Sequence, residues 1–196
     1  MSNVYNDYVN RLEIYNNLIK EQNKSITAIA YLRFFTLIIG LGVTFYTFRI
    51  KSYYISIGIF IFQLLIFIYL VIKHDKEIKK RKYSIALKDI NEKAIKKLNG
   101  EWKSFEDDGR EFKNEDHSYS NDLDIFGRGS LFQWINSSKT FMGRQNLKNR
   151  LTNPLKTSLD IKKAQEALQE LARAVEWRQL FEAEGLIVSN KCIFSI

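Results

Sequence analysis

The chain has 196 residues, a formal net charge of +8 at pH 7, one cysteine and two histidines. A single cysteine excludes an internal disulfide, and so few soft ligands, far apart in the sequence, give no metal-binding cluster. The positive charge would suit nucleic acid, but residues 73–100 alone carry +6 and directly follow an apolar segment. That position is typical of a membrane surface, so the charge is mainly a membrane signal.

Residues 1–25 predict an amphipathic N-terminal helix. Apolar side chains recur there at helical spacing, at Val4, Tyr8, Leu12, Tyr15, Leu18 and Ile19. Such a helix either lies on a membrane surface or packs against a later domain, and the sequence leaves both placements open.

Two apolar segments follow, and together they predict a transmembrane hairpin over residues 26–72. The second segment, Ser52–Ile72, has 21 residues without a charge. As a helix it would span about 31 Å, close to the roughly 30 Å hydrocarbon core of a bilayer. Gln63 is its one strongly polar side chain. A buried helix of a soluble core is the less favoured alternative, because such helices are usually shorter and rarely apolar on every face.

The first segment, Ile26–Phe48, is weaker evidence for a span. Its uncharged part begins only at Phe34, so a helix that spans the membrane must also include the residues before Arg33. The Arg33 side chain would then extend to the membrane interface. A re-entrant segment is the competing interpretation. Only a short loop at residues 49–52 separates the two segments, so two spanning helices must be antiparallel. Basic residues are more numerous on the flanks than in this loop, which predicts a two-pass protein of the cell inner membrane with both termini cytoplasmic.

Residues 73–100 predict a basic juxtamembrane linker helix. Apolar positions step by three or four from Tyr83 to Leu98, and Asn99-Gly100 is a typical stop. The pattern is compatible with one continuous helix from the second membrane segment. Membrane lipids are an expected partner, because anionic headgroups would attract the basic cluster formed by Lys79, Lys80, Arg81 and Lys82.

The remaining region, residues 101–196, predicts short helices joined by turns. Its beginning is acidic, and Asp107-Asp108-Gly109 indicates a turn. Ser130–Asn136 predicts a short buried helix with four apolar side chains, at Leu131, Phe132, Trp134 and Ile135. Thr140 is a suitable N-cap for a further helix that ends near Thr152.

A longer helix is predicted over about Ser158–Glu184. Thr157 with Asp160 resembles the capping box that would open it, and Gly185 is expected to end it. Trp134 and Trp177 are expected in the core, and Leu186–Val188 is the one candidate for a brief strand. The predicted fold class is therefore all-α: a two-helix transmembrane hairpin, a linker helix and a helical domain.

No catalytic, cofactor or metal site is predicted. The stretch Gly127–Ser130 lacks the lysine and spacing of a phosphate-binding loop, so we expect a turn with Gly129 or Ser130 as N-cap. His117, beside Asp116 and Tyr119, has no partner nucleophile or second base in view. A structural hydrogen bond is the favoured role for this histidine. Two carboxylates on one turn, Asp122 and Asp124, are weak evidence for a metal.

The stretch Asp122–Phe132 has the sequence DLDIFGRGSLF. It resembles the start of the core domain of MutS-family mismatch-repair proteins, most closely in the branch that carries membrane segments ahead of that core. The resemblance extends over about Asn91 to Gly185. Ser118 and Ala164 depart from that branch, which usually has proline and arginine there. Upstream of this stretch, the matching residues are Trp102, Phe105, Gly109 and His117–Tyr119. Downstream, the pattern continues in order with Thr140, Gly143-Arg144, Leu151, Asn153-Pro154, Ile161, Gln165, Ala167 and Glu170-Leu171.

The resemblance implies that residues 101–196 are part of a helical MutS-type core, in a protein that binds mismatched or structured DNA in an ATP-dependent way. Such proteins usually form homodimers. ATP and Mg are expected only for the family's ATPase domain, because the chain has no G-x-x-x-x-G-K-[ST] motif. The chain is thus expected to be a truncated form or a fragment. DNA or phosphate contact is assigned to Arg144, Lys148 and Arg150, whose charges could neutralise phosphates.

An alternative function from another class is a membrane-tethered interaction module. In this interpretation the helical domain is a docking surface that acts on neither DNA nor ATP. Lysines and arginines such as those of residues 127–165 are often only the solvated faces of helices.

Overall fold

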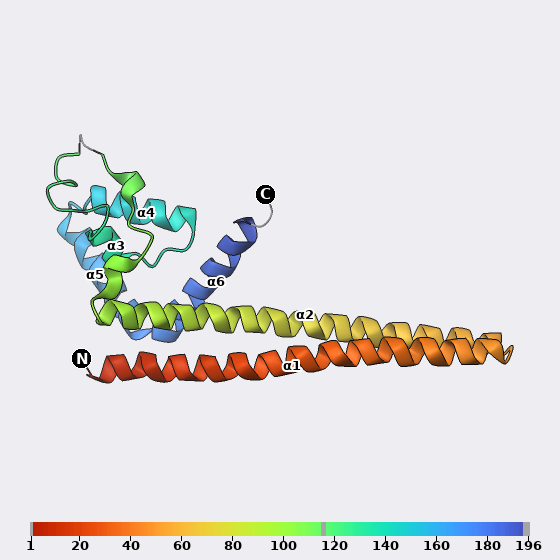
Figure 1. The fold of residues 1–196 in the computed structure, drawn as a ribbon. Coiled ribbons are helices and arrows are strands. Elements are labelled where there is room, and N and C mark those ends of the chain that lie inside the picture. Colours follow the sequence, from red (N-terminus) through yellow and green to blue (C-terminus); the bar gives the residue numbers. More distant parts are fainter. Residues whose placement is uncertain (1, 115–116, 194–196) are drawn as a thin grey trace. The chain divides into compact units, whose positions relative to one another are not determined.

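The computed structural model describes residues 2–114 and 117–193 (Figure 1). All regular elements in these residues are helical, which confirms the predicted all-α fold class. The α-helices are α1 (Ser2–Arg49), α2 (Tyr53–Leu98), α3 (Leu131–Ile135), α4 (Phe141–Thr152), α5 (Ser158–Arg173) and α6 (Val175–Ile193). Two short 3₁₀ turns, η1 (Glu101–Ser104) and η2 (Arg110–Phe112), lie between α2 and α3.

The chain divides into two compact units. One is a helical hairpin, Ile14–Ile85, and the other is a helical domain that combines Met1–Glu13 with Ala86–Ile196. The N-terminal segment and the first apolar segment are parts of one helix, α1, and the linker helix continues the second apolar segment in α2.

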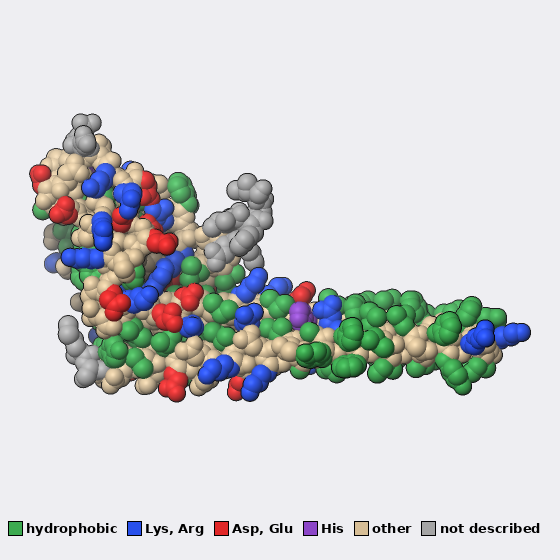
Figure 2. Space-filling view, viewed as in Figure 1, with side chains coloured by type: hydrophobic (Ala, Val, Ile, Leu, Met, Phe, Trp, Pro, Cys, Tyr) green, Lys and Arg blue, Asp and Glu red, His purple; other side chains and the backbone are tan. Residues whose placement is uncertain are grey.

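The hairpin unit consists of the antiparallel parts of α1 and α2 around a tight turn. Lys51 in this turn has a φ of 64°, a left-handed conformation that costs energy for a residue with a side chain. Both helices are long and apolar enough to cross a membrane. Between Phe34 and Ile72 most of their exposed side chains are apolar, and Figure 2 shows hydrophobic side chains gathered on this part of the hairpin.

The two hairpin helices approach closely at Gly40. A Cβ atom at this position would lie 2.0 Å from Cδ of Gln63. The absence of a side chain on α1 therefore makes room for the one strongly polar side chain of the second apolar segment. Close approach at small residues is how helices gain packing contacts in a membrane, where no hydrophobic effect drives them together.

The helical domain has a small aromatic core. Phe132 of α3 is fully buried, with Ile125 and Phe126 of the preceding loop against it. The Phe112 ring packs edge-on against Phe126 and Phe132, with ring centroids 5.8 and 5.6 Å apart. Leu147 of α4 covers the same cluster from one side. The core is therefore built largely from irregular chain, and α3 and α4 hold it in place.

The predicted caps of α4 and α5 are confirmed. The Thr140 hydroxyl accepts a hydrogen bond from the Gly143 amide at 3.2 Å. The Thr157 hydroxyl accepts from the Asp160 amide at 3.2 Å and donates to the Asp160 carboxylate at 2.6 Å. Each contact satisfies an amide that the first helical turn leaves unpaired.

The prediction of one helix from Ser158 to Glu184 is wrong. Ala174 is non-helical, with a ψ of 56°, and divides the region into α5 and α6. Gly185 does not end a helix: α6 continues through it, and the Lys139 side chain lies 3.5 Å from where a Cβ would be. Packing of α6 in the domain therefore outweighs the roughly 1 kcal/mol that glycine costs inside a helix. The candidate strand Leu186–Val188 is helical for the same reason.

Two burial predictions are also wrong. Trp134 and Trp177 are 51% and 55% exposed, so neither belongs to the core. Of the four apolar residues of α3 that were predicted to be buried, only Phe132 is buried. The reason is the length of α3: five residues form little more than one turn, which can bury only one side of the helix.

Candidate functional site

Polar side chains join the two helices of the hairpin unit. The Gln63 amide donates to the backbone carbonyls of Thr36 and Leu37, both at 3.4 Å. Nearer the turn, the Ser56 hydroxyl donates to the Thr44 carbonyl at 3.1 Å. In hydrocarbon no water can satisfy such groups, so bonds of this kind fix the register of a helix pair.

Arg33, predicted to reach the membrane interface, lies against an aromatic ring of the other helix. Its guanidinium carbon is 5.3 Å from the Phe67 ring centroid. The ring face offers the cation a favourable electrostatic contact. A charge near the end of the apolar segment is thereby partly shielded within the hairpin unit.

The basic cluster of α2 is largely open to solvent. Lys79, Lys80 and Lys82 are exposed, and Arg81 is half-buried. Lys80 pairs with Glu77 at 2.7 Å, a surface contact that contributes little to stability. The contact of this cluster with anionic lipid headgroups stays a prediction.

Arg144 of α4 is engaged inside the helical domain. One of its terminal nitrogens donates to the Asp107 carboxylate at 2.7 Å and also pairs with Glu111. Its guanidinium carbon lies 5.4 Å from the Phe112 ring centroid. Burial lowers the pKa of Arg144, but the hydrogen bond and charge of Asp107, with those of Glu111, raise it above its usual value overall. The group is permanently charged and already neutralised by two carboxylates.

The other two predicted phosphate contacts lie further along the same helix. Lys148 is half-buried, beside His117 and Asn153 in a small hollow, and Arg150 is exposed. Lys148 lies one helical turn beyond Arg144. The structure thus places the three residues on one helix but leaves only Lys148 and Arg150 without a carboxylate partner among the described contacts.

The segment after residue 116 closes the C-terminal end of α4. The Tyr119 hydroxyl donates to the Leu151 carbonyl at 2.9 Å, and Nε2 of His117 lies 3.2 Å from the Thr152 carbonyl. The two rings pack edge-on at 4.6 Å. His117 therefore has the structural hydrogen bond that the sequence predicts, while Asp116 lies outside the described residues.

The turn Gly127–Ser130 has the structural role expected of it. The Ser130 hydroxyl accepts from the Gln133 amide as the N-cap of α3. The buried Gln133 side chain accepts from the Gly129 amide at 2.8 Å and donates to the Phe105 carbonyl at 2.6 Å and the Lys103 carbonyl at 3.4 Å. The backbone amides of Gly127, Gly129 and Ser130 are thus bonded to protein acceptors and are not available to a phosphate.

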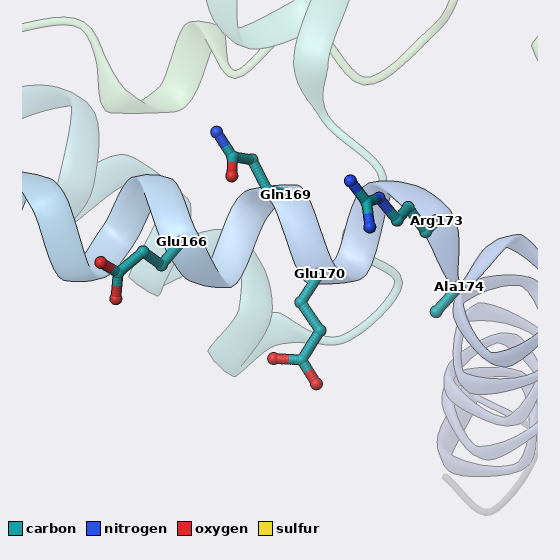
Figure 3. Close-up of a pocket in the computed structure, with 5 residues that line it drawn as sticks. All are labelled: Glu166, Gln169, Glu170, Arg173 and Ala174. Atoms are coloured by element: carbon teal, nitrogen blue, oxygen red, sulfur yellow. The ribbon is translucent and has the colours of Figure 1, made fainter.

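A shallow hollow lies along α5 where it ends at Ala174 (Figure 3). Glu166 and Glu170 point to one side of the helix, and Gln169 and Arg173 point to the other. The two carboxylates and the guanidinium do not converge on a common point, and this hollow offers no pair of groups placed for acid–base chemistry.

The polar contacts that order the domain could not be predicted from the sequence. These are the Asp107–Arg144 pair, the Asp108–Arg110 pair at 2.8 Å, and the Lys139–Glu182 pair at 3.0 Å. Most join residues far apart in sequence, and charged residues in an ordinary composition give no signal of which will meet. Within residues 2–114 and 117–193, no group of three or more His, Cys, Asp or Glu side chains is arranged to hold a metal.

No known protein family, curated protein or solved structure was found to match this chain.

Proposed function

We propose that this chain is a membrane-anchored, MutS-like DNA-binding protein whose hairpin crosses the cell inner membrane twice and holds the helical domain on the cytoplasmic side. The hairpin is the observation that supports anchoring in a membrane. Its two helices are long and apolar enough to span, and most of their exposed side chains between Phe34 and Ile72 are apolar. Exposed lysines follow the second apolar segment, on the side that the positive-inside rule assigns to the cytoplasm.

Reporter fusions test the topology. A reporter fused after Lys82 should be active in its cytoplasmic form, and one fused after Lys51 in its extracytoplasmic form. A reporter at Lys82 that proves extracytoplasmic overturns both the orientation and the DNA-related role.

The DNA-binding part of the proposal rests on the resemblance of residues 91–185 to the MutS core and on the basic side chains of α4. Lys148 and Arg150 are the residues we propose to contact phosphates, because Arg144 is neutralised by Asp107 and Glu111. Mismatched or structured duplex DNA is the proposed ligand. ATP and Mg would act through an ATPase domain of the family's kind, in a homodimeric assembly.

A salt titration of DNA binding by the full chain in nanodiscs tests this role. Removing both charges, with Lys148→Gln and Arg150→Gln, should weaken binding and reduce the slope of log K against log salt by about 1 for each lost phosphate contact. Lys88→Gln is the matched control, because Lys88 is paired with Glu92 on α2. DNA binding that is absent even at low salt would refute the proposal.

A membrane-tethered interaction module is the second candidate, and one observation favours it. Helix α5 buries none of its residues, and its apolar side chains Leu159 and Leu168 are 62% and 66% exposed. Exposed apolar surface of this kind marks interaction sites. If the chain binds no DNA at low salt, but substitution of Leu168 by Lys abolishes association with a co-purifying protein, this candidate replaces the first.

A further inference from the structure

A cavity of about 1050 Å³ lies within the helical domain, between the end of α2, the chain after it and α6. Its volume is at the upper end of the range for small-molecule sites. Six cationic side chains and three acidic ones line it, which gives the lining a net charge of +3. The cations are Lys93, Lys96, Lys97, Lys139, Arg144 and Arg178.

The charges of this lining do not balance internally. Arg144 is paired with Asp107, and Lys139 is paired with Glu182 at 3.0 Å. Glu106 is then the one lining carboxylate left to offset the remaining four cations. The described contacts of this lining give Lys93 and Lys96 no carboxylate within ion-pairing distance.

Among these cations, Lys97 gives the strongest evidence for an anion site. It is half-buried, and its ammonium has only a long contact of 3.4 Å to the Asn136 carbonyl. Desolvation by the surrounding protein lowers its pKa, and Glu182 only partly offsets this effect. A charged group that is desolvated without a full partner costs free energy, and an anion bound beside it would recover that cost.

We propose that this cavity binds a small molecule that carries a diphosphate group. Compact ammonium groups bind phosphate oxygens as point charges, and the partly desolvated lining strengthens that attraction relative to water. A net charge of +3 matches the charge of a diphosphate better than that of one carboxylate. The concave shape of the cavity favours a whole small molecule over the convex backbone of a DNA duplex.

Calorimetric titration of the full chain in nanodiscs with inorganic pyrophosphate, at constant ionic strength, tests the proposal. Saturable binding is expected, at least tenfold tighter than binding of inorganic phosphate. At alkaline pH, binding should take up more protons in the wild type than in Lys97→Arg, because a bound anion would bring the lowered pKa of Lys97 back up. This uptake is measured by repeating the titration in buffers with different heats of ionisation.

Variants separate the cavity from general surface charge. The double substitution Lys93→Gln with Lys97→Gln should weaken pyrophosphate binding at least tenfold. Lys97→Arg keeps the charge and should stay within about threefold of the wild type. Lys88→Gln, on α2 but outside the cavity, should have no effect. Circular dichroism and thermal unfolding verify that each variant is folded.

Four results would overturn the proposal. These are no saturation at millimolar pyrophosphate, equal weakening by Lys88→Gln and the double variant, citrate binding as tightly as pyrophosphate, and displacement of pyrophosphate by duplex DNA or anionic vesicles. The last result would assign the cations of the cavity to a nucleic acid or a lipid headgroup.

Discussion

The side chains of Asn91 and Gln179 bond to each other in the interior of the helical domain, although 88 residues separate them in the sequence. Nε2 of Gln179 donates to Oδ1 of Asn91 at 2.8 Å. Nδ2 of Asn91 donates to the Leu87 carbonyl at 2.7 Å. Asn91 is fully buried and Gln179 is 5% exposed, so water cannot replace these bonds. The pair joins α6 to the end of α2.

Removing one partner of this pair should destabilise the domain. Asn91→Leu keeps the approximate volume but leaves the Gln179 amide buried without its partner, which costs about 1–3 kcal/mol. The double variant Asn91→Leu with Gln179→Met removes both polar groups and should recover part of this loss. Urea unfolding of the chain in detergent, followed by circular dichroism, measures the difference. A double variant less stable than Asn91→Leu alone would contradict this account.

Gly109→Ala should be much more costly than the same change at Gly100. Both glycines have a positive φ, 69° and 80°, which costs a side chain roughly 1–2 kcal/mol. At Gly109 a Cβ would also lie 2.6 Å from the Phe132 ring at the centre of the core, and such overpacking costs about 1–3 kcal/mol more. At Gly100 the space is open. Thermal unfolding of both variants measures the contrast, and equal losses would show that the Phe132 ring moves aside freely.

Asp108 should contribute to stability at neutral pH and lose that contribution in acid. Hydrogen bonds from the Arg110 side chain hold the pKa of this carboxyl below its usual range, although burial acts in the opposite direction. A lowered folded-state pKa means that the contribution is complete above the unfolded pKa of about 3.9 and is lost as the pH falls through the folded value. Unfolding free energies measured from pH 7 down to pH 2 should therefore fall less steeply in Asp108→Asn. Asp122→Asn, at an exposed position, is the control. If the loss of stability at acidic pH were the same in Asp108→Asn as in the wild type, the role given to Asp108 would be refuted.

The close approach of the hairpin helices depends on Gly40 and not on Gly42. A leucine at Gly40 would occupy the space of the Gln63 side chain, whereas nothing lies within 4 Å of a Cβ at Gly42. Gly40→Leu should therefore separate the helices and expose the Gln63 amide, while Gly42→Leu should be tolerated. Disulfide cross-linking between cysteines introduced at Thr44 and Ser56 reports the separation, in a background without Cys192. Efficient cross-linking in Gly40→Leu would contradict the packing.

The sequence predicts local features of this fold well and long-range ones poorly. The caps Thr140 and Thr157 are correct because capping joins residues only three positions apart. The division at Ala174 and the exposure of Trp177 depend on how α6 packs against the end of α2, through contacts such as Asn91 with Gln179. Helical periodicity along one segment holds no information on that packing.

The candidate phosphate contacts show the same contrast between local features, which the sequence predicts, and long-range contacts, which it does not. Charge patterning selects Arg144, Lys148 and Arg150 together as one group of basic residues on a predicted helix. Only the folded chain brings Asp107 and Glu111 to Arg144 and thereby separates it from the other two. The α2 lysines of the cavity, Lys93, Lys96 and Lys97, were not selected, because Lys97 on α2 and Lys139 in the loop before α4 become neighbours only through folding.

The buried Gln133 side chain has a consequence for how the domain opens. Its single amide holds Lys103 and Phe105 on one side and Gly129 on the other. These backbone segments belong to no common sheet or helix, so one side chain provides the connection that a ladder of backbone hydrogen bonds would otherwise supply. Native-state hydrogen exchange should then find the Gly129 amide protected only while α3 is formed. The loops on both sides of the aromatic core thus unfold together with α3 as one cooperative unit.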